Sequence, residues 1–385
     1  MALPDHRYLN TAEALQKFCD VINTRQHLII DTEFLRERTY WPQLCLIQLK
    51  SDEHLACVDA IAIKDLSPLL AVMDNPAITK VFHAASQDLE IFYYQFNRLP
   101  TPLFDTQIAA PLLGHNDQIG YANLVKGMLD LELDKSQTRA DWTQRPLSEK
   151  QLSYALDDVI YLEQLYKLMS EQLLALNRLE WLAPEFEAQS DPHKYQQNAG
   201  DRWLRIKQIH RYKGGTLAII QALANWREIK AREKDLPRNW IIKDDAICTL
   251  AQQKPVNEDE LSRIRTLERK TQDRYGKEIL QIVSEAKDVT PMPLPESKKK
   301  KKLGAASQAQ IQLLNAWAHH KAHELNIATS ILAPQKLLEQ SVIESPSDAL
   351  AGWRTPLLVE DFTALLNGNA TLQATDNGLK LKQKT

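Results

Sequence analysis

The segment from Val289 to Lys302 restricts what this chain can fold into more than any other feature of its sequence. Prolines at positions 291, 293 and 295 are followed by five consecutive lysines at positions 298–302. Proline cannot donate a backbone hydrogen bond and a run of like charges repels itself, so we expect an extended, solvated tether here. The 385 residues should therefore divide into separate domains, and the length favours two or three of roughly 100 to 200 residues each.

A second boundary falls in the polar segment 190–200, which carries several turn-forming residues. The pieces on either side of the tether both show helical apolar spacing. We therefore predict a first domain over residues 1–190, a helical domain over 203–288, a linker over 289–302 and a second helical domain over 303–372. The tail from Ala374 to Thr385 is expected to be frayed.

Composition excludes several classes of protein. With 44% hydrophobic and 25% charged residues, the chain has the composition of globular proteins, not of disordered or fibrous ones. It has no apolar stretch long enough to cross a membrane, and its first ten residues lack the basic and apolar regions of a secretory signal, so we expect a cytoplasmic protein. The four cysteines are widely spaced, which favours buried free thiols over a disulfide or zinc framework.

The net charge of −3 hides an uneven distribution. Residues 1–190 contain 16 basic and 27 acidic side chains, whereas residues 201–290 contain 19 basic and 14 acidic ones. An acidic region is either a solvated surface or a place where carboxylates gather around metal ions, and a basic region suits a polyanion.

The first domain alternates short β-rich runs with helical patterns, as α/β layer folds do. Runs at 27–31, 44–49 and 55–59 follow one another, with turn-forming residues at 51–53 between the last two, and this order predicts an antiparallel meander. Further strands are expected at 78–83 and 103–105, with helices at 66–73 and 87–96. A long helix capped by Ser148 should close the domain near residue 176.

The two helical pieces resemble a distant internal repeat. Each has a tryptophan in an early amphipathic helix, Trp226 in the first and Trp317 in the second, followed by an Asn-bearing turn and another helix. We interpret both tryptophans as core residues of small domains, in preference to platforms on which bases stack.

Two carboxylates stand at the end of the first strand. Asp31 and Glu33 are two residues apart, and side chains at this spacing on a strand point to the same face. Desolvated carboxylates repel each other unless a proton or cation lies between them, and hard oxygen ligands of this kind suit Mg²⁺ or Mn²⁺. Taken alone, the DxE pattern is more often a pair of exposed acids, so it needs partners.

Partners occur at two later positions. Asp88 follows the strand 78–83 where the chain passes into a helix. The alternative is an ordinary acid in the first turn of that helix, where the helix dipole stabilises negative charge. Tyr154 and Asp158 lie four residues apart on the long helix, so they share one face, as an ordinary surface pair also would. Together these groups are what a phosphodiesterase needs to hold two metal ions about 3.5 to 4 Å apart.

This order of motifs, DxE, then an aspartate after a strand, then YxxxD on a helix, resembles the DEDD superfamily of 3'→5' exonucleases and its tyrosine branch. The segments TYWPQLCLIQ at 39–48 and HAASQDLE at 83–90 are similar to ribonuclease D, and the two helical pieces look like HRDC domains. The resemblance covers nearly the whole chain. It implies an α/β RNase H-like nuclease domain, with a mixed sheet flanked by helices, followed by two all-α HRDC-like domains.

The resemblance also implies hydrolysis of RNA from its 3' end with stepwise release of nucleoside 5'-monophosphates. Transfer RNA precursors and other structured RNA would be the substrates, two divalent ions (Mg²⁺ or Mn²⁺) the cofactors, and neither a membrane nor an obligate protein partner is expected. Asp31 would bridge both ions, and Glu33 and Asp158 would complete the site of the ion that activates the nucleophile. Asp88 would support the other ion, and Tyr154 would orient the attacking water.

Contacts with RNA are expected outside this set. Phe34 could wedge against the terminal base or simply fill the core, and His83 is expected beside the metal site. The basic helical domain would track phosphates, which makes binding sensitive to salt. Its candidate residues are Arg202, Arg205, Lys207, Arg211 and Lys213, and the lysine run 298–302 would add nonspecific affinity or only keep the tether soluble. The Gly-rich segment 213–216 is either a phosphate-binding turn or, more simply, a turn between helices.

Two alternatives stay open. One is a DNA-directed exonuclease with the same chemistry, and the other is a catalytically idle protein that binds nucleic acid. The complete set of acids argues against the second, because the loss of a ligand would be the sign of decay.

Overall fold

The computed structural model describes residues 4–134, 136–138, 140–196, 198–295 and 303–384, so the lysine run 298–302 lies outside the described residues. The chain forms two compact units. The first consists of Met1–Glu33, Cys45–Lys194 and Lys301–Thr385, and the second of Phe34–Leu44 and Tyr195–Lys300. The second unit therefore contains a short segment, Phe34–Leu44, that the sequence pattern assigned to the first domain.

A six-stranded mixed sheet forms the core of the α/β domain, which ends at Lys194, with the strand order β1-β4-β3-β2-β5-β6. β3 and β4 pair antiparallel, as predicted, whereas β2 pairs parallel with β5, and β5 with β6. The sequence pattern missed only the first strand of this sheet. The strands are β1 (Arg7–Leu9), β2 (His27–Leu35), β3 (Gln43–Ser51), β4 (His54–Asp59), β5 (Thr79–Phe82) and β6 (Leu103–Asp105).

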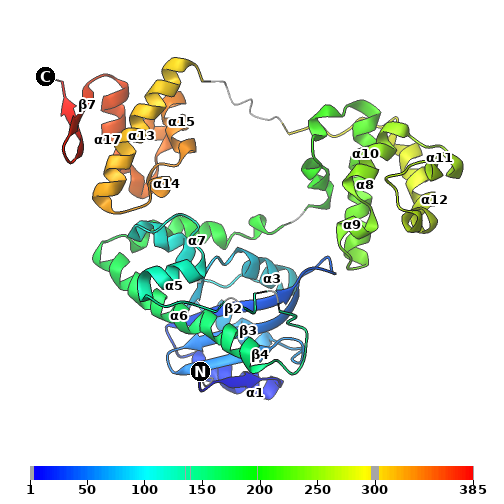
Figure 1. The fold of residues 1–385 in the computed structure, drawn as a ribbon, viewed down its shortest axis with the longest axis horizontal. Helices are drawn as coiled ribbons and strands as arrows, with labels where there is room; N and C mark the ends of the chain where they lie inside the picture. The colour runs from blue at the N-terminus through cyan, green and yellow to red at the C-terminus, as the bar shows by residue number, and fades with distance from the viewer. Residues whose placement is uncertain (1–3, 135, 139, 197, 296–302, 385) are drawn as a thin grey trace. The chain divides into compact units, whose positions relative to one another are not determined.

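Helices flank this sheet, and α6 runs across one of its faces in contact with β4 and β5 (Figure 1). Ser148 caps α6 as predicted: its hydroxyl accepts a bond from the Gln151 amide, and the Gln151 side chain accepts one from the Ser148 amide. The helices of this domain are α1 (Ala12–Ile22), α2 (Ser67–Asp74), α3 (Ser86–Phe96), α4 (Thr106–Ala109), α5 (Tyr121–Leu129), α6 (Glu149–Ala175) and α7 (Ala183–Gln189), with 3₁₀ turns at Ala110–Leu113, Leu179–Leu182 and Pro192–Lys194.

The parallel strands bring the predicted motifs to one edge of the sheet. Ile29 on β2 lies opposite Val81 on β5, and Phe82 lies opposite Asp105 on β6. Because the carboxyl ends of parallel strands meet at the same edge, Asp31 on β2 and the residues that follow β5 emerge side by side.

The second unit contains the first helical module, residues 195–295, whose core includes Trp226, as predicted. The Trp226 indole donates a hydrogen bond to Glu278 at 2.9 Å. The helices are α8 (Gly214–Glu233), α9 (Arg238–Ile241), α10 (Asp244–Gln253), α11 (Glu258–Ser262) and α12 (Arg269–Ala286), preceded by 3₁₀ turns at Ala199–Arg205 and Ile209–Arg211.

The second helical module, residues 303–384, also contains a core tryptophan whose indole bonds to a carboxylate. Trp317 is buried in its core, and its indole donates to Asp361 at 2.8 Å. The matching pairs of tryptophan and carboxylate support the proposed internal repeat. The helices are α13 (Ala305–Leu325), α14 (Thr329–Leu332), α15 (Gln335–Ile343), α16 (Pro346–Ala349) and α17 (Thr355–Leu366), with a 3₁₀ turn at Gly352–Arg354.

The prediction of a frayed tail was wrong. Residues 370–383 form an antiparallel hairpin of β7 (Ala370–Thr375) and β8 (Gly378–Gln383), in which Leu372 lies opposite Leu381. The two-residue connection is Asp376-Asn377, and Gly378 follows with a φ of 117°. This is the turn chemistry of tight hairpins, and it was readable in the sequence.

The second helical module packs against the α/β domain, within the first unit. The Arg178 guanidinium donates to the carbonyl oxygen of Leu112 at 2.7 Å and to that of Leu325 at 2.6 Å. The rings of Trp181 and Trp353 stack with their centroids 4.5 Å apart and an angle of 1° between their planes. A shared cation and a stacked aromatic pair fix this module to the α/β domain.

The cysteines agree with the sequence prediction. Cys19, Cys45 and Cys57 are buried, Cys248 is half-buried, and no disulfide joins any of these four described residues. Among the described helices, none has the length and hydropathy to span a membrane.

We predict that Gly215→Ala destabilises the first helical module. A Cβ at this position would lie 2.0 Å from the carbonyl oxygen of Lys287, which is backbone and cannot move aside easily. This close approach also favours the turn between helices over the phosphate-binding turn. The expected loss in the free energy of unfolding is about 1 to 3 kcal/mol, measured by urea denaturation.

Gly127→Ala is the matched control. Gly127 lies within α5, and a Cβ there would contact only the His115 ring, at 3.7 Å. This variant should be neutral or slightly more stable, since alanine favours the helix. Equal stability of the two variants would contradict the steric argument.

Candidate active site

Three carboxylates from two distant parts of the α/β domain meet at the edge of the sheet. Asp31 and Glu33 come from β2 and Asp158 from α6, and one oxygen atom of each lies within 4.8 Å of the others. The residues before them on β2, Leu28 to Ile30, are fully buried, which anchors the strand in the core. The strand and helix spacings therefore bring these three acids together as the sequence analysis expected.

Asp88, on α3, is a fourth acid beside this group. It lies in the first turn of α3, is only 7% exposed, and accepts a hydrogen bond from the Thr32 hydroxyl at 2.5 Å. Thr32 is the residue between Asp31 and Glu33, so this bond links Asp88 to the strand that carries both acids, and the charge of Asp88 contributes to the raised pKa of Glu33. Asp88 is thus adjacent to the three acids.

The acids raise one another's pKa values. Burial, followed by the charges of Asp31, Asp158 and Asp88, raises the pKa of Glu33 to about 10. Burial, followed by the charge of Asp157, raises the pKa of Asp158 to about 7. Burial and the charge of Asp158 raise the pKa of Asp31, and burial and the charge of Asp31 raise that of Asp88. A divalent cation would relieve this repulsion, so the donor set fits Mg²⁺ or Mn²⁺.

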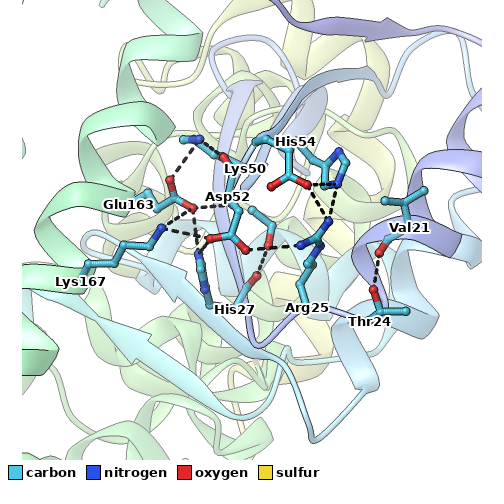
Figure 2. Close-up of polar contacts among 11 residues, drawn as sticks. Val21, Thr24, Arg25, His27, Lys50, Asp52, His54, Glu163 and Lys167 are labelled. Atoms are coloured by element: carbon cyan, nitrogen blue, oxygen red, sulfur yellow. Dashed lines mark hydrogen bonds and ion pairs between the residues drawn. The ribbon is translucent and has the colours of Figure 1, made fainter.

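In a second group of residues that could bind a metal, nearby basic side chains balance the negative charge of the acids. His27, Asp52 and Glu163 also lie within 4.8 Å of one another. Figure 2 shows that basic side chains surround them: Lys50 is 3.0 Å from Glu163, and Lys167 is 3.1 Å from Asp52. Burial alone would raise the pKa of Glu163, but bonds from His27 and Lys50 lower it to about 2. This cluster carries its own cations and is a structural ion-pair network.

Tyr154 completes the first group. Burial and the charge of Asp158 raise the pKa of its phenol to about 12, so it is protonated at neutral pH and can donate a hydrogen bond. Asp31, Glu33 and Asp158 share a cleft of about 370 Å³ with this phenol, whereas Asp88 is not among the residues that line it. Its lining includes Asp31, Glu33, His83, Tyr121, Thr138, Tyr154, Asp157 and Asp158.

Larger cavities occur elsewhere, of about 490 Å³ beside Trp181 and Trp353 and about 540 Å³ beside α11 and α12. Within the described chain, neither contains a cluster of acids at ligand spacing. Cavity volume therefore does not identify the candidate active site, whereas the cluster of acids at ligand spacing does.

Asp105 is a supporting residue that the sequence analysis missed. It is fully buried at the end of β6, and its carboxylate accepts bonds from the amides of Ala84 and Ala85, both at 2.9 Å. Ala84 has a left-handed φ of 57°, which is unusual for alanine. Asp105 therefore holds the bend that leads into Asp88. An aspartate directly after a short strand was the available signal.

The remaining predicted residues lie in different surroundings. His83 lines the cleft and bonds to the Thr106 hydroxyl at 2.9 Å, and burial lowers its pKa to about 4, so it is neutral. Phe34 follows Glu33 on β2 and is half-buried. Arg202 is mostly buried and lies 3.3 Å from Glu228. Arg205, Lys207, Arg211 and Lys213 are exposed on the first helical module.

Comparison with known proteins agrees with this geometry. A family described as 3'-5' exonuclease matches residues 6–174, and the HRDC domain family matches residues 216–283. Ribonuclease D from Granulibacter bethesdensis is 34% identical over 386 residues, which cover 98% of this chain and 97% of that protein. The chain belongs to the ribonuclease D family.

Other relatives agree. Ribonuclease D from Bartonella henselae is 38% identical over 360 residues, covering 92% of this chain and 88% of the relative. The crystal structure of Escherichia coli RNase D, described as an exoribonuclease involved in structured RNA processing, matches with a TM-score of 0.79 and 31% identity, covering 95% of this chain and 99% of that one. These matches support a 3'→5' exoribonuclease with an RNase H-like domain and an HRDC domain. The second HRDC domain and the tyrosine branch stay predictions.

For this member of the ribonuclease D family, we predict that Asp158→Asn stabilises the metal-free protein. A raised pKa means that folding disfavours the ionised carboxylate, so the free energy of unfolding falls as pH rises from the ordinary pKa of 3.8 to about 7 and levels off above that. The neutral amide removes this cost, which is about 1 to 2 kcal/mol at pH 8 after a discount for solvent screening. The same variant should lose the rise in Tm that Mg²⁺ or Mn²⁺ gives the parent protein.

Asp157→Asn is the matched control, because Asp157 is adjacent on α6 but is not one of the three converging acids. It should keep the rise in Tm on addition of metal. The opposite pattern would assign the metal to Asp157.

We predict that Glu163→Gln lowers the free energy of unfolding by about 3 kcal/mol at pH 7, because it leaves buried basic groups without their partner. The pKa of Glu163 is lowered from 4.5, so the carboxylate's contribution is complete above about 4.5 and is lost as pH falls towards 2. Urea unfolding should therefore show a large difference between variant and parent at pH 7 and a small one near pH 2. Exposed Glu171→Gln on α6 is the control and should match the parent protein. A rise in Tm with Mg²⁺ that depended on Glu163 would contradict the structural assignment.

Proposed function

We propose that this ribonuclease D family member is a divalent-metal-dependent exonuclease that trims the 3' ends of structured RNA, with transfer RNA precursors as the natural substrate class. The observation that carries the proposal is the convergence of Asp31, Glu33 and Asp158 in a cleft that they share with a protonated phenol. A complete acid set favours this function over a catalytically idle nucleic-acid-binding protein.

The donor set suggests how the chain would hold two metal ions. The charge of Asp31 raises the pKa of both Glu33 and Asp88, so Asp31 is our candidate for the carboxylate that would help to hold both ions. Glu33 and Asp158 would complete one site, and Asp88 would support the other. When bound, such ions supply an acidified water and neutralise charge on the leaving oxygen.

Tyr154 would orient the attacking water. With a pKa near 12 it is a hydrogen-bond donor at neutral pH, and we do not propose it as a general base. Thr138 forms a hydrogen bond with the Tyr154 side chain, and this bond would direct the phenol. His83 is neutral at the edge of the cleft and would contact substrate without adding charge.

RNA phosphates would bind the first helical module. Arg205, Lys207, Arg211 and Lys213 are exposed and follow one another along two 3₁₀ turns and the start of α8. Counterion release makes such binding salt-dependent and tolerant of sequence. Arg202 is left out of this set, because it is committed to Glu228.

The test is incubation of a 5'-labelled RNA that has a single-stranded 3' end with Mg²⁺, with Mn²⁺ or with a chelator. We expect a ladder of single-nucleotide steps from the 3' end that disappears with chelator. A DNA of the same sequence, run in parallel, should be degraded much more slowly. Faster degradation of the DNA would favour the DNA-directed alternative, and intact RNA that is nevertheless bound would favour the idle one.

We predict that Asp31→Asn lowers kcat by at least about 10³-fold while RNA binding is retained and Tm is not lowered, because charge stabilisation at the reacting centre is lost and the fold is not. Asp130→Asn is the control: Asp130 is an exposed carboxylate with a left-handed φ of 55°, which asparagine also tolerates, and it should keep full activity. Near-normal turnover by Asp31→Asn would overturn the site assignment.

A further inference from the structure

Residues 34–44, which follow the strand that carries Asp31 and Glu33, are built into the core of the first helical module. Tyr40 is only 7% exposed and belongs to the same hydrophobic core as Trp226. Trp41 packs against this core, and its ring lies edge-on to that of Tyr40 with centroids 4.7 Å apart. A surface loop would not bury one aromatic ring and pack a second, half-buried ring against the same core.

The Tyr40 hydroxyl is hydrogen-bonded within a network of buried charged side chains. The hydroxyl donates a hydrogen bond to Glu228, which is completely buried, and accepts bonds from Arg232 at 3.0 Å and Arg238 at 2.9 Å. Arg238 also lies 2.5 Å from Glu228, and Arg202 lies 3.3 Å from it. The phenol is therefore a member of this network, and its removal would leave a buried carboxylate without one of its donors.

The backbone of the segment is held as well as its side chain. The amides of Tyr40 and Trp41 both donate to one carboxylate oxygen of Asp235, each at 3.0 Å. The Arg238 guanidinium lies 4.6 Å from the centre of the Tyr40 ring. Two amides, a ring and a hydroxyl together specify a single bound conformation, in the way that a recognition peptide is held.

We propose that residues 34–44 are an intramolecular docking segment, with Tyr40 as a positioning residue that ties the RNA-binding module to the catalytic strand. Tyr40 is seven residues beyond Glu33, so even a fully extended chain between them spans no more than about 25 Å. Docking of Tyr40 therefore limits how far the module can move from the metal-binding acids. This inference rests on the proposed exoribonuclease function. It adds a way in which long RNA substrates would be delivered to the cleft.

The proposal separates long substrates from short ones. A structured RNA that is long enough to reach both the module and the cleft would gain from a limit on how far apart they can move. An RNA of five nucleotides would occupy the cleft alone. Loss of docking should therefore raise KM for the long substrate and leave kcat and KM for the short one unchanged.

The experiment compares the full chain with Tyr40→Phe and Tyr275→Phe. Tyr275 is a matched control: it is buried in the same core, and no hydrogen-bond partner of its hydroxyl is found among the described residues. We expect Tyr40→Phe to raise KM for a structured RNA by about tenfold, with little change for the five-nucleotide RNA. Tyr275→Phe should leave both substrates unaffected.

Hydrogen exchange supplies a readout that is independent of activity. In the parent protein, the amides of Tyr40 and Trp41 should be protected, and Tyr40→Phe or Tyr40→Ala should accelerate their exchange at least about tenfold. If Tyr40→Ala fails to fold, Tyr40→Phe alone decides, because it keeps the ring.

An equal loss on both substrates would mean that Tyr40 only stabilises the module, and that result would overturn the proposal. Unchanged KM together with unchanged exchange would overturn it too, because the segment would then not depend on Tyr40. If the parent protein degrades neither RNA, the proposed function fails, while the exchange of the two amides still tests docking by itself.

Discussion

Repulsion among carboxylates on β2 and α6 is the constraint on which the α/β domain depends. At an effective dielectric constant near 20, two such charges 4 Å apart oppose each other by about 4 kcal/mol, so they stay together only if the elements that carry them are rigid. The buried apolar run before Asp31 and the reciprocal cap at Ser148 supply that rigidity at the two ends. Asp105 does the same for the bend before Asp88.

The same domain contains the opposite solution to the same problem. Around Glu163, the acids are matched by lysine, arginine and histidine, and the result is a neutralised network in the scaffold. Around Glu33, the neighbours are further acids, and the charge is left for a ligand to satisfy. Residue types alone do not separate the two clusters, because both offer three ligand-type side chains at similar spacing. The surrounding charge does.

Local periodicity explains what the sequence could predict. The i, i+2 spacing of Asp31 and Glu33 and the i, i+4 spacing of Tyr154 and Asp158 follow from strand and helix geometry, so these faces were predictable. The docking of Tyr40 was not, because its partners are nearly 200 residues away and nothing in the run 34–44 distinguishes a buried phenol from a loop residue. The hairpin at the end of the chain had a local signal in Asn377 and Gly378 that compositional reasoning overlooked.

The tryptophan and carboxylate pairs at Trp226 and Trp317 show one interior plan used twice. Around that plan the surfaces differ: residues 201–290 carry five more basic than acidic side chains, whereas residues 303–385 carry six basic and seven acidic ones. Two helical modules with the same kind of buried pair can therefore carry surfaces of different charge. The first module thus has a surface charge that suits a polyanion, while the second packs against the α/β domain.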